Sequence, residues 1–155
     1  METIIGVIGA ANASEKEEKT SEEVGVLIAK GDCFLLCGGM GGVMEAACRG
    51  AKSAGGTTIG ILPGPEASLA NRFIDIPIVT GMGEARNVIV AKSSHSIIAI
   101  GGSFGTLSEI SFALKSGIPV IGLDTWDVSE EIIKCETPEE AVRTAFELSS
   151  LRKRA

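Results

Sequence analysis

The sequence predicts an α/β protein built on a doubly wound, Rossmann-like parallel sheet with helices on both faces. Short apolar runs alternate with helical patterns along the whole chain, and each run has the length of one buried strand. Two of these runs lead through glycine-rich turns into helices, which is typical of strand-to-helix connections in such sheets. The 155 residues fit one domain, residues 1–155.

The expected elements follow the chain in order. Continuous apolar runs predict strands at 4–8, 33–37, 57–62, 74–80, 96–100, 119–123 and 132–135. Helical periodicity and capping patterns predict helices at 21–30, 43–53, 84–93, 106–115 and 137–151. We expect 63–72 to be irregular, because two prolines and a glycine open it.

Ligands bind beyond the carboxyl ends of the strands in sheets of this class. Both glycine turns lie at that edge. If the strand at 74–80 lies between those at 4–8 and 96–100, three strand spacings separate the two turns, roughly 14 Å. A nucleoside monophosphate spans such a gap, with the turns at 9–12 and 81–83 lying between its ends.

Composition restricts the class of partner and the compartment. The net charge of −6 and the pI near 4.9 argue against a general nucleic-acid or anionic-membrane surface. The first residues lack the basic start and long apolar run of a signal peptide, so we expect a cytoplasmic protein. The four cysteines are expected to be buried, reduced thiols. With a single histidine and no clustered ligands, no metal site is expected.

The glycine turns are the candidate anion sites. Backbone that lacks side chains lets a phosphate approach N–H groups at the positive end of a helix dipole. The candidates in the later turn are Gly101, Gly102, Ser103, Gly105 and Thr106, and those in the earlier turn are Gly38, Gly39, Gly41 and Gly42. Gly9, after the first strand, is assigned to the same site. The alternative is that these glycines serve only tight turns.

Two charged residues near these turns have competing interpretations. Thr106-x-x-Glu109 fits a capping box, in which Thr106 begins the helix and Glu109 bonds back to it. Glu109 also suits catalysis, where a carboxylate faces the positive charge that develops as a glycosidic bond breaks. Arg86, in the first turn of its helix, opposes the dipole by roughly 0.3–1 kcal/mol, a cost that an anionic ligand offsets. The alternative for Arg86 is a solvated side chain or a pair with Glu84.

The segment from Gly101 to Glu109 resembles the motif P-G-G-x-G-T-x-x-E of the Lonely Guy (LOG) or "lysine decarboxylase-like" superfamily, and in particular its molybdenum-cofactor-carrier-like branch. Arg86, within Glu-Ala-Arg-Asn, matches the upstream arginine of that family. The turn from Gly38 to Gly42 matches the family's earlier glycine turn. The chain departs from the LOG pattern at Gly101, which replaces proline, and at Ser103, which replaces glycine.

The resemblance implies two functions. LOG enzymes are nucleoside 5′-monophosphate phosphoribohydrolases, which assigns catalysis of N-glycosidic hydrolysis to Arg86 and Glu109. Carrier-like members bind the molybdenum cofactor, a phosphate-bearing pterin, without turnover, so the cofactor is a bound ligand and none is required for activity. The main prediction is therefore a phosphorylated, nucleotide-like ligand with LOG-like hydrolysis as the candidate activity; the alternative is a cofactor carrier.

The resemblance, together with the apolar segment 67–73, also implies a homo-oligomer. A weaker similarity to DprA-type proteins implies binding of single-stranded DNA. The acidic charge and the aromatic content of only 4% argue against that third function, because single-strand binding relies on basic grooves and stacking rings.

Overall fold

The computed structural model describes residues 2–152 as a seven-stranded parallel sheet with five α-helices. The strands are β1 Ile4–Gly9, β2 Phe34–Cys37, β3 Thr58–Leu62, β4 Ile76–Val79, β5 Ser96–Ile100, β6 Val120–Leu123 and β7 Ile133–Cys135. The helices are α1 Glu15–Lys30, α2 Val43–Ser53, α3 Asn87–Ser93, α4 Phe104–Lys115 and α5 Pro138–Arg152, with 3-10 turns η1 Ala67–Leu69 and η2 Gly83–Arg86.

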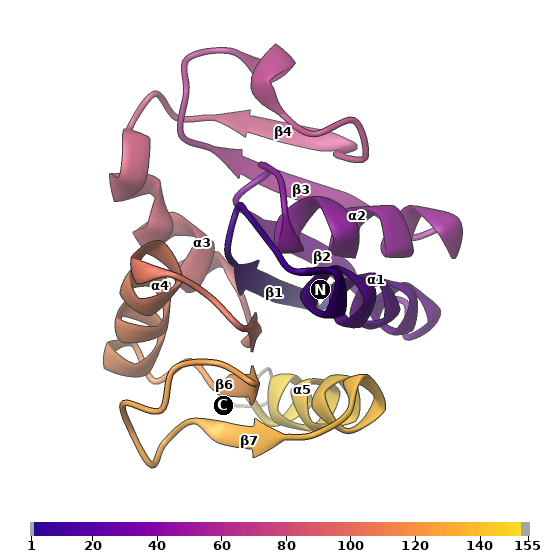
Figure 1. Ribbon diagram of the computed structural model, residues 1–155, viewed down its shortest axis with the longest axis vertical. Coiled ribbons are helices and arrows are strands. Elements are labelled where there is room, and N and C mark those ends of the chain that lie inside the picture. The colour runs from indigo at the N-terminus through magenta and orange to yellow at the C-terminus, as the bar shows by residue number, and fades with distance from the viewer. Residues whose placement is uncertain (1, 153–155) are drawn as a thin grey trace.

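The sheet has the order β4-β3-β2-β1-β5-β6-β7, and every neighbouring pair is parallel. Helices α1, α2 and α5 cover one face, while α3 and α4 cover the other (Figure 1). This arrangement confirms the predicted doubly wound class. The order reverses between β1 and β5, which places the topological switch point at the carboxyl ends of these two strands.

Alternate residues of the central strands point to opposite faces of the sheet and pack into two separate hydrophobic cores. Ile5 and Val7 of β1 pack with residues of α1, α2 and α5, whereas Ile8 packs with Val90 of α3 and Ile110 of α4. Each fully buried side chain of this size stabilises the fold by about 1.5–3 kcal/mol. Because both faces are covered, the inner strands are apolar apart from Thr58 and Ser96, the first residues of β3 and β5.

The predicted strand order is wrong at one strand. β4 pairs with the outer side of β3 and does not lie between β1 and β5. Two strand spacings, roughly 10 Å, therefore separate the turns after β2 and β5. All four residues of β4 are exposed, and an apolar run alone does not distinguish an uncovered edge strand from a buried one.

Two helices also begin earlier than predicted. α1 begins at Glu15, six residues before the expected start, where Ser14 and Glu17 form a capping box. α4 begins at Phe104 and has Ser103 as its N-cap, so Thr106 lies within the first turn. The capping-box interpretation of Thr106 and Glu109 is therefore wrong.

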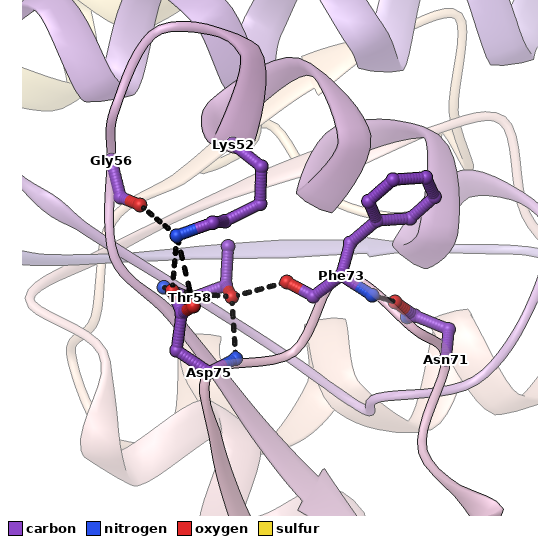
Figure 2. Close-up of polar contacts among 6 residues, drawn as sticks. All are labelled: Lys52, Gly56, Thr58, Asn71, Phe73 and Asp75. Carbon is purple, nitrogen blue, oxygen red and sulfur yellow. Dashed lines mark hydrogen bonds and ion pairs between the residues drawn. The ribbon is translucent and has the colours of Figure 1, made fainter.

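Side chains fix the start of the edge strand to the interior of the sheet (Figure 2). The carboxylate of Asp75 accepts hydrogen bonds from the Thr58 N–H at 3.0 Å and from Lys52 Nζ at 2.9 Å. The hydroxyl of Thr58 in turn donates to the Phe73 carbonyl at 2.6 Å. Asn71 Oδ1 accepts from the Phe73 N–H at 3.0 Å. The β3–β4 connection is thus ordered although it contains only one short 3-10 turn.

Other predicted features fall into structural roles. All four cysteines are buried, as expected. Nδ1 of His95 accepts a hydrogen bond from the Ile4 N–H at 3.1 Å, so His95 joins the start of β5 to β1. Within residues 2–152, no helix is long and apolar enough to cross a bilayer. The same residues contain no group of three or more His, Cys, Asp or Glu arranged to hold a metal ion.

Candidate functional site

A cavity of about 220 Å³ opens at the switch point, between the carboxyl ends of β1 and β5. Residues from five separate segments of the chain line it: Gly9, Ala11, Met44, Pro63, Glu84, Arg86, Asn87, Ser103, Gly105, Thr106 and Glu109. Of the predicted site residues, Gly9, Arg86, Ser103, Gly105, Thr106 and Glu109 are thus brought together.

A buried arginine and carboxyl group, the only such pair among the described residues, lie together in this cavity. Oε1 of Glu109 is 3.5 Å from Nη1 of Arg86, and the two residues are 6% and 8% exposed. Nη1 of Arg86 donates to Oδ1 of Asn87 at 2.9 Å, and Asn87 donates to Ser108 at 3.0 Å. The buried Nε of Arg86 has no hydrogen-bond partner. Arg86 therefore carries unused donor capacity, which is unusual for a buried guanidinium.

Burial shifts the protonation of both charged groups. It raises the pKa of Glu109 to about 8, because loss of hydration outweighs the attraction of Arg86. It lowers the pKa of Arg86 from its ordinary value of 12.5, against the opposing effect of Glu109. At neutral pH Arg86 remains a cation while Glu109 is mostly neutral. The buried part of the cavity then carries the positive charge of Arg86, while the exposed Glu84 contributes a carboxylate to the lining.

The turn after β5 adds backbone donors to this charge. Gly101 and Gly102 adopt positive φ values of 52° and 120°, which other residues rarely adopt. The Ser103 N–H is taken by Thr106 Oγ1 at 3.3 Å. The N–H groups of Phe104 and Gly105, in the first turn of α4, have no partner among residues 2–152. Of the backbone N–H groups predicted to bind an anion in this turn, some are therefore free among the described residues, and that of Ser103 is bonded within the protein.

Gly105 has no structural reason to be glycine. Its φ is not positive, and a Cβ built there meets no atom within 4 Å. Gly102 differs, because a Cβ there would collide with Thr106, and Gly101 differs because a Cβ would collide with Glu17. An alanine at position 105 would meet no steric obstacle, so the space beside Gly105, which lines the cavity, is open.

The turn after β2 supports the cavity from outside. Gly38 lies against the guanidinium of Arg86, and a Cβ there would collide with it. Gly39 and Gly42 have positive φ values of 74° and 61°, and a Cβ at either would meet other backbone or Leu62. Gly41 has only ordinary contacts. None of these four glycines lines the cavity. Their contact with a ligand stays a prediction.

Five lining residues were not assigned to the site from the sequence: Ala11, Met44, Pro63, Glu84 and Asn87. Glu84 lies two residues before Arg86 on η2, and the alternative pairing of Arg86 with Glu84 is not the one observed. Met44 and Pro63 reach the cavity through tertiary packing alone. The one available signal was that Met44 and Pro63 each follow a strand closely, and so belong to the carboxyl edge.

A second cavity, of about 340 Å³, lies by the carboxyl ends of β5 and β6, between α1 and α5. Its polar lining includes Lys16 and the carboxylates of Glu17, Asp124 and Glu136. Although larger, this cavity is dominated by negative charge and repels anions. The smaller cavity at Arg86 is therefore the candidate site for a phosphorylated ligand.

The chain belongs to the SLOG cluster4 family, whose model matches residues 2–151. A molybdenum cofactor binding protein from the phototrophic bacterium Rippkaea orientalis is 38% identical, with a TM-score of 0.89 over 96% of this chain and 98% of that one. The molybdenum cofactor carrier protein of Chlamydomonas reinhardtii is also 38% identical, with a TM-score of 0.89 over 97% and 99% of the two chains.

A cytokinin riboside 5′-monophosphate phosphoribohydrolase of Mycobacterium tuberculosis is 30% identical over 132 residues, covering 79% of this chain and 71% of the enzyme. These similarities confirm the SLOG and LOG-like relationship and its carrier-like branch. DNA processing protein A of Streptococcus pneumoniae is 17% identical with a TM-score of 0.73, a similarity that shows the fold alone.

Proposed function

We propose that this protein binds the molybdenum cofactor, or a closely related phosphorylated pterin, and carries it without turnover. One observation carries the proposal: the buried Arg86 has an unpartnered Nε and lies in a cavity that is also lined by Gly105, whose helix N–H is unpartnered among the described residues. Such a combination suits a phosphate, which has several acceptor oxygens. The similarity to cofactor-binding proteins supports a pterin as the attached group.

The cavity residues divide between the two ends of such a ligand. The N–H groups of Phe104 and Gly105 and the guanidinium of Arg86 hold the phosphate. The mostly neutral Glu109 does not repel the anion and offers both a donor and an acceptor to it or to the pterin. With about 220 Å³, the cavity encloses the phosphate end, and the ring system lies at its mouth.

A direct titration tests the proposal. Trp126 is the only tryptophan of the chain, and its Nε1 donates to the Ser103 carbonyl at 3.0 Å, so its fluorescence reports on the turn before α4. We expect anaerobic titration with molybdenum cofactor to give a saturable change with one ligand per chain. Absence of any saturable change, with equilibrium dialysis also showing no retention, would overturn the proposal.

The second candidate is phosphoribohydrolase activity, which the meeting of Arg86 and Glu109 in one cavity and the mycobacterial relative favour. A neutral Glu109 does not stabilise a cationic sugar, so this activity requires ionised Glu109 and must rise above about pH 8. Incubation with AMP and other nucleoside monophosphates at pH 7 and pH 9 decides the matter. The carrier function predicts no free base or ribose 5-phosphate at either pH.

We also propose that the protein acts in the cytoplasm as a homo-oligomer assembled through the β4 edge. Leu69, Met82 and the apolar residues of β4 are each 43–50% exposed. Between 67 and 83 the only charged residues are Arg72 and Asp75, so this surface avoids the self-repulsion of a chain with net charge −6. Light scattering tests this proposal: a mass of 16.0 kDa would overturn it.

A further inference from the structure

Two buried thiols lie behind the cavity. Cys37 is the last residue of β2, Cys48 lies in α2, and their Sγ atoms are 3.6 Å apart. Both side chains are fully buried, with no exposed surface. A disulfide requires Sγ atoms about 2.05 Å apart, so the pair must close by about 1.5 Å to form one.

Contacts connect this thiol pair to Arg86. Sγ of Cys37 accepts a hydrogen bond from the Gly39 N–H at 3.3 Å. Between these residues, Gly38 lies directly against the Arg86 guanidinium. A change in the Cys37 side chain is thus transmitted through two glycines to the cation of the cavity.

We propose that Cys37 and Cys48 are a site of oxidative modification by peroxide, forming an intramolecular disulfide that weakens anion binding at Arg86. The formation of the bond stands on the geometry of the thiols alone. Its effect on binding rests on the proposed function.

The chemistry needs one peroxide and no other reagent. The Cys37 thiol gives up its proton, and the thiolate attacks an oxygen of hydrogen peroxide and breaks the O–O bond. Cys37 becomes a sulfenic acid, and the displaced hydroxide takes the proton and leaves as water. The Cys48 sulfur then attacks the sulfenic sulfur and the S–O bond breaks. The proton of the Cys48 thiol passes to the leaving hydroxyl, which departs as a second water. Two thiols are oxidised by two electrons and one peroxide is reduced.

The surroundings assign the attacking role to Cys37. The hydrogen bond between the two thiols, together with the bond that the Gly39 N–H donates to Cys37 Sγ, lowers the pKa of Cys37. The hydrogen bond between the thiols and burial raise the pKa of Cys48. Closing the S–S bond turns Cys37 Sγ toward α2 and away from the Gly39 N–H. The turn then loses one of its attachments and Gly38 shifts against Arg86. Because both thiols are buried, oxidation needs a local opening of the turn after β2, which a ligand bound at Arg86 slows.

Peptide mapping tests bond formation. The folded protein is treated with hydrogen peroxide, its remaining thiols are alkylated after denaturation, and the peptides are identified by mass spectrometry. We expect a Cys37–Cys48 linked peptide in the wild type and in the control Cys135→Ser, and none in Cys48→Ser or Cys48→Ala. Recovery of alkylated Cys37 and Cys48 from the treated wild type would overturn the proposal. Thermal melts of both Cys48 variants identify any failure to fold.

A second measurement tests the coupling. The affinity for molybdenum cofactor, read from Trp126 fluorescence, is expected to fall at least ten-fold on oxidation and to recover with dithiothreitol. Folded Cys48→Ser must keep its affinity after peroxide. A mapped disulfide with unchanged affinity rejects the coupling. If the reduced protein binds no cofactor, the proposed function and the coupling fall together, while the linked peptide still decides whether the disulfide forms.

Discussion

Oε1 of Glu109 lies 3.5 Å from Nη1 of Arg86, close enough to interact electrostatically and too far for a strong hydrogen bond. The two residues come from α4 and η2; η2 leads directly into α3, which packs against α4 on one face of the sheet. A buried cation that is only loosely paired destabilises the folded state unless another group binds it. Under the proposed function, a bound anion completes this pairing.

Replacing Arg86 tests the anion site. We expect Arg86→Gln to reduce affinity for molybdenum cofactor at least ten-fold, because the cation and its unpartnered Nε are lost. Arg86→Lys keeps the charge without the planar fork and is expected to bind with intermediate affinity. Fluorescence titration of Trp126 measures both variants. Wild-type affinity in Arg86→Gln would show that the ligand binds elsewhere.

The pH dependence of stability tests the protonation of Glu109. Its pKa is about 8 in the folded protein and near 4.5 when unfolded, so the folded state retains a proton that the unfolded state loses between these values. The resulting stability is fully present below about pH 4.5 and is lost as pH rises through about 8, amounting to a few kcal/mol at about 1.4 kcal/mol per unit. Glu109→Gln removes this loss.

Urea unfolding at pH 5 and pH 9 measures the effect. The stability difference between the two pH values is expected to be smaller in Glu109→Gln than in the wild type. Glu147→Gln, at an exposed position of α5, serves as the matched control and is expected to keep the wild-type difference. Identical profiles for Glu109→Gln and the wild type would mean that Glu109 is ionised at neutral pH.

Gly105→Ala separates binding from folding. Because a Cβ at this position meets no atom within 4 Å, the variant is expected to be as stable as the wild type or roughly 0.5–1 kcal/mol more stable. The new methyl group faces the cavity, and affinity for molybdenum cofactor is expected to fall at least ten-fold. Ser111→Ala, exposed on the same helix, is the control. A binding affinity that survives Gly105→Ala would remove Gly105 from the site.

The same substitution at Gly25 is expected to have the opposite effect on stability. A Cβ on Gly25 of α1 would overlap the backbone carbonyl of Ala47 in α2, at the place where these helices pack closely. We expect Gly25→Ala to destabilise the protein by about 1–3 kcal/mol through overpacking, despite the better helix propensity of alanine. Thermal melting measures this as a decrease of about 2–4 °C per kcal/mol.

The sequence allowed prediction of every strand and of the carboxyl edge as the candidate site, because periodicity and glycine turns are local signals. It did not allow prediction of the place of β4, since pairing partners are chosen by packing between distant segments. For the same reason the contact between Gly38 and Arg86 could not be predicted, because nothing in the residues next to Gly38 along the chain indicates that Arg86 packs against it. The pattern Thr106-x-x-Glu109 misled because Ser103 competes for the same capping position.

The attachment of β4 through Asp75 has a consequence for the solubility of the chain. In the single chain, Ile76, Ile78 and Val79 form a short, exposed apolar segment at an open sheet edge, the kind of segment from which aggregates grow when it frays. Pro77 interrupts it with a residue that lacks an N–H, and the Asp75 carboxylate holds its first residue to β3. Loss of that carboxylate would therefore first be noticed as precipitation on storage or heating, well before the cavity at Arg86 is disturbed.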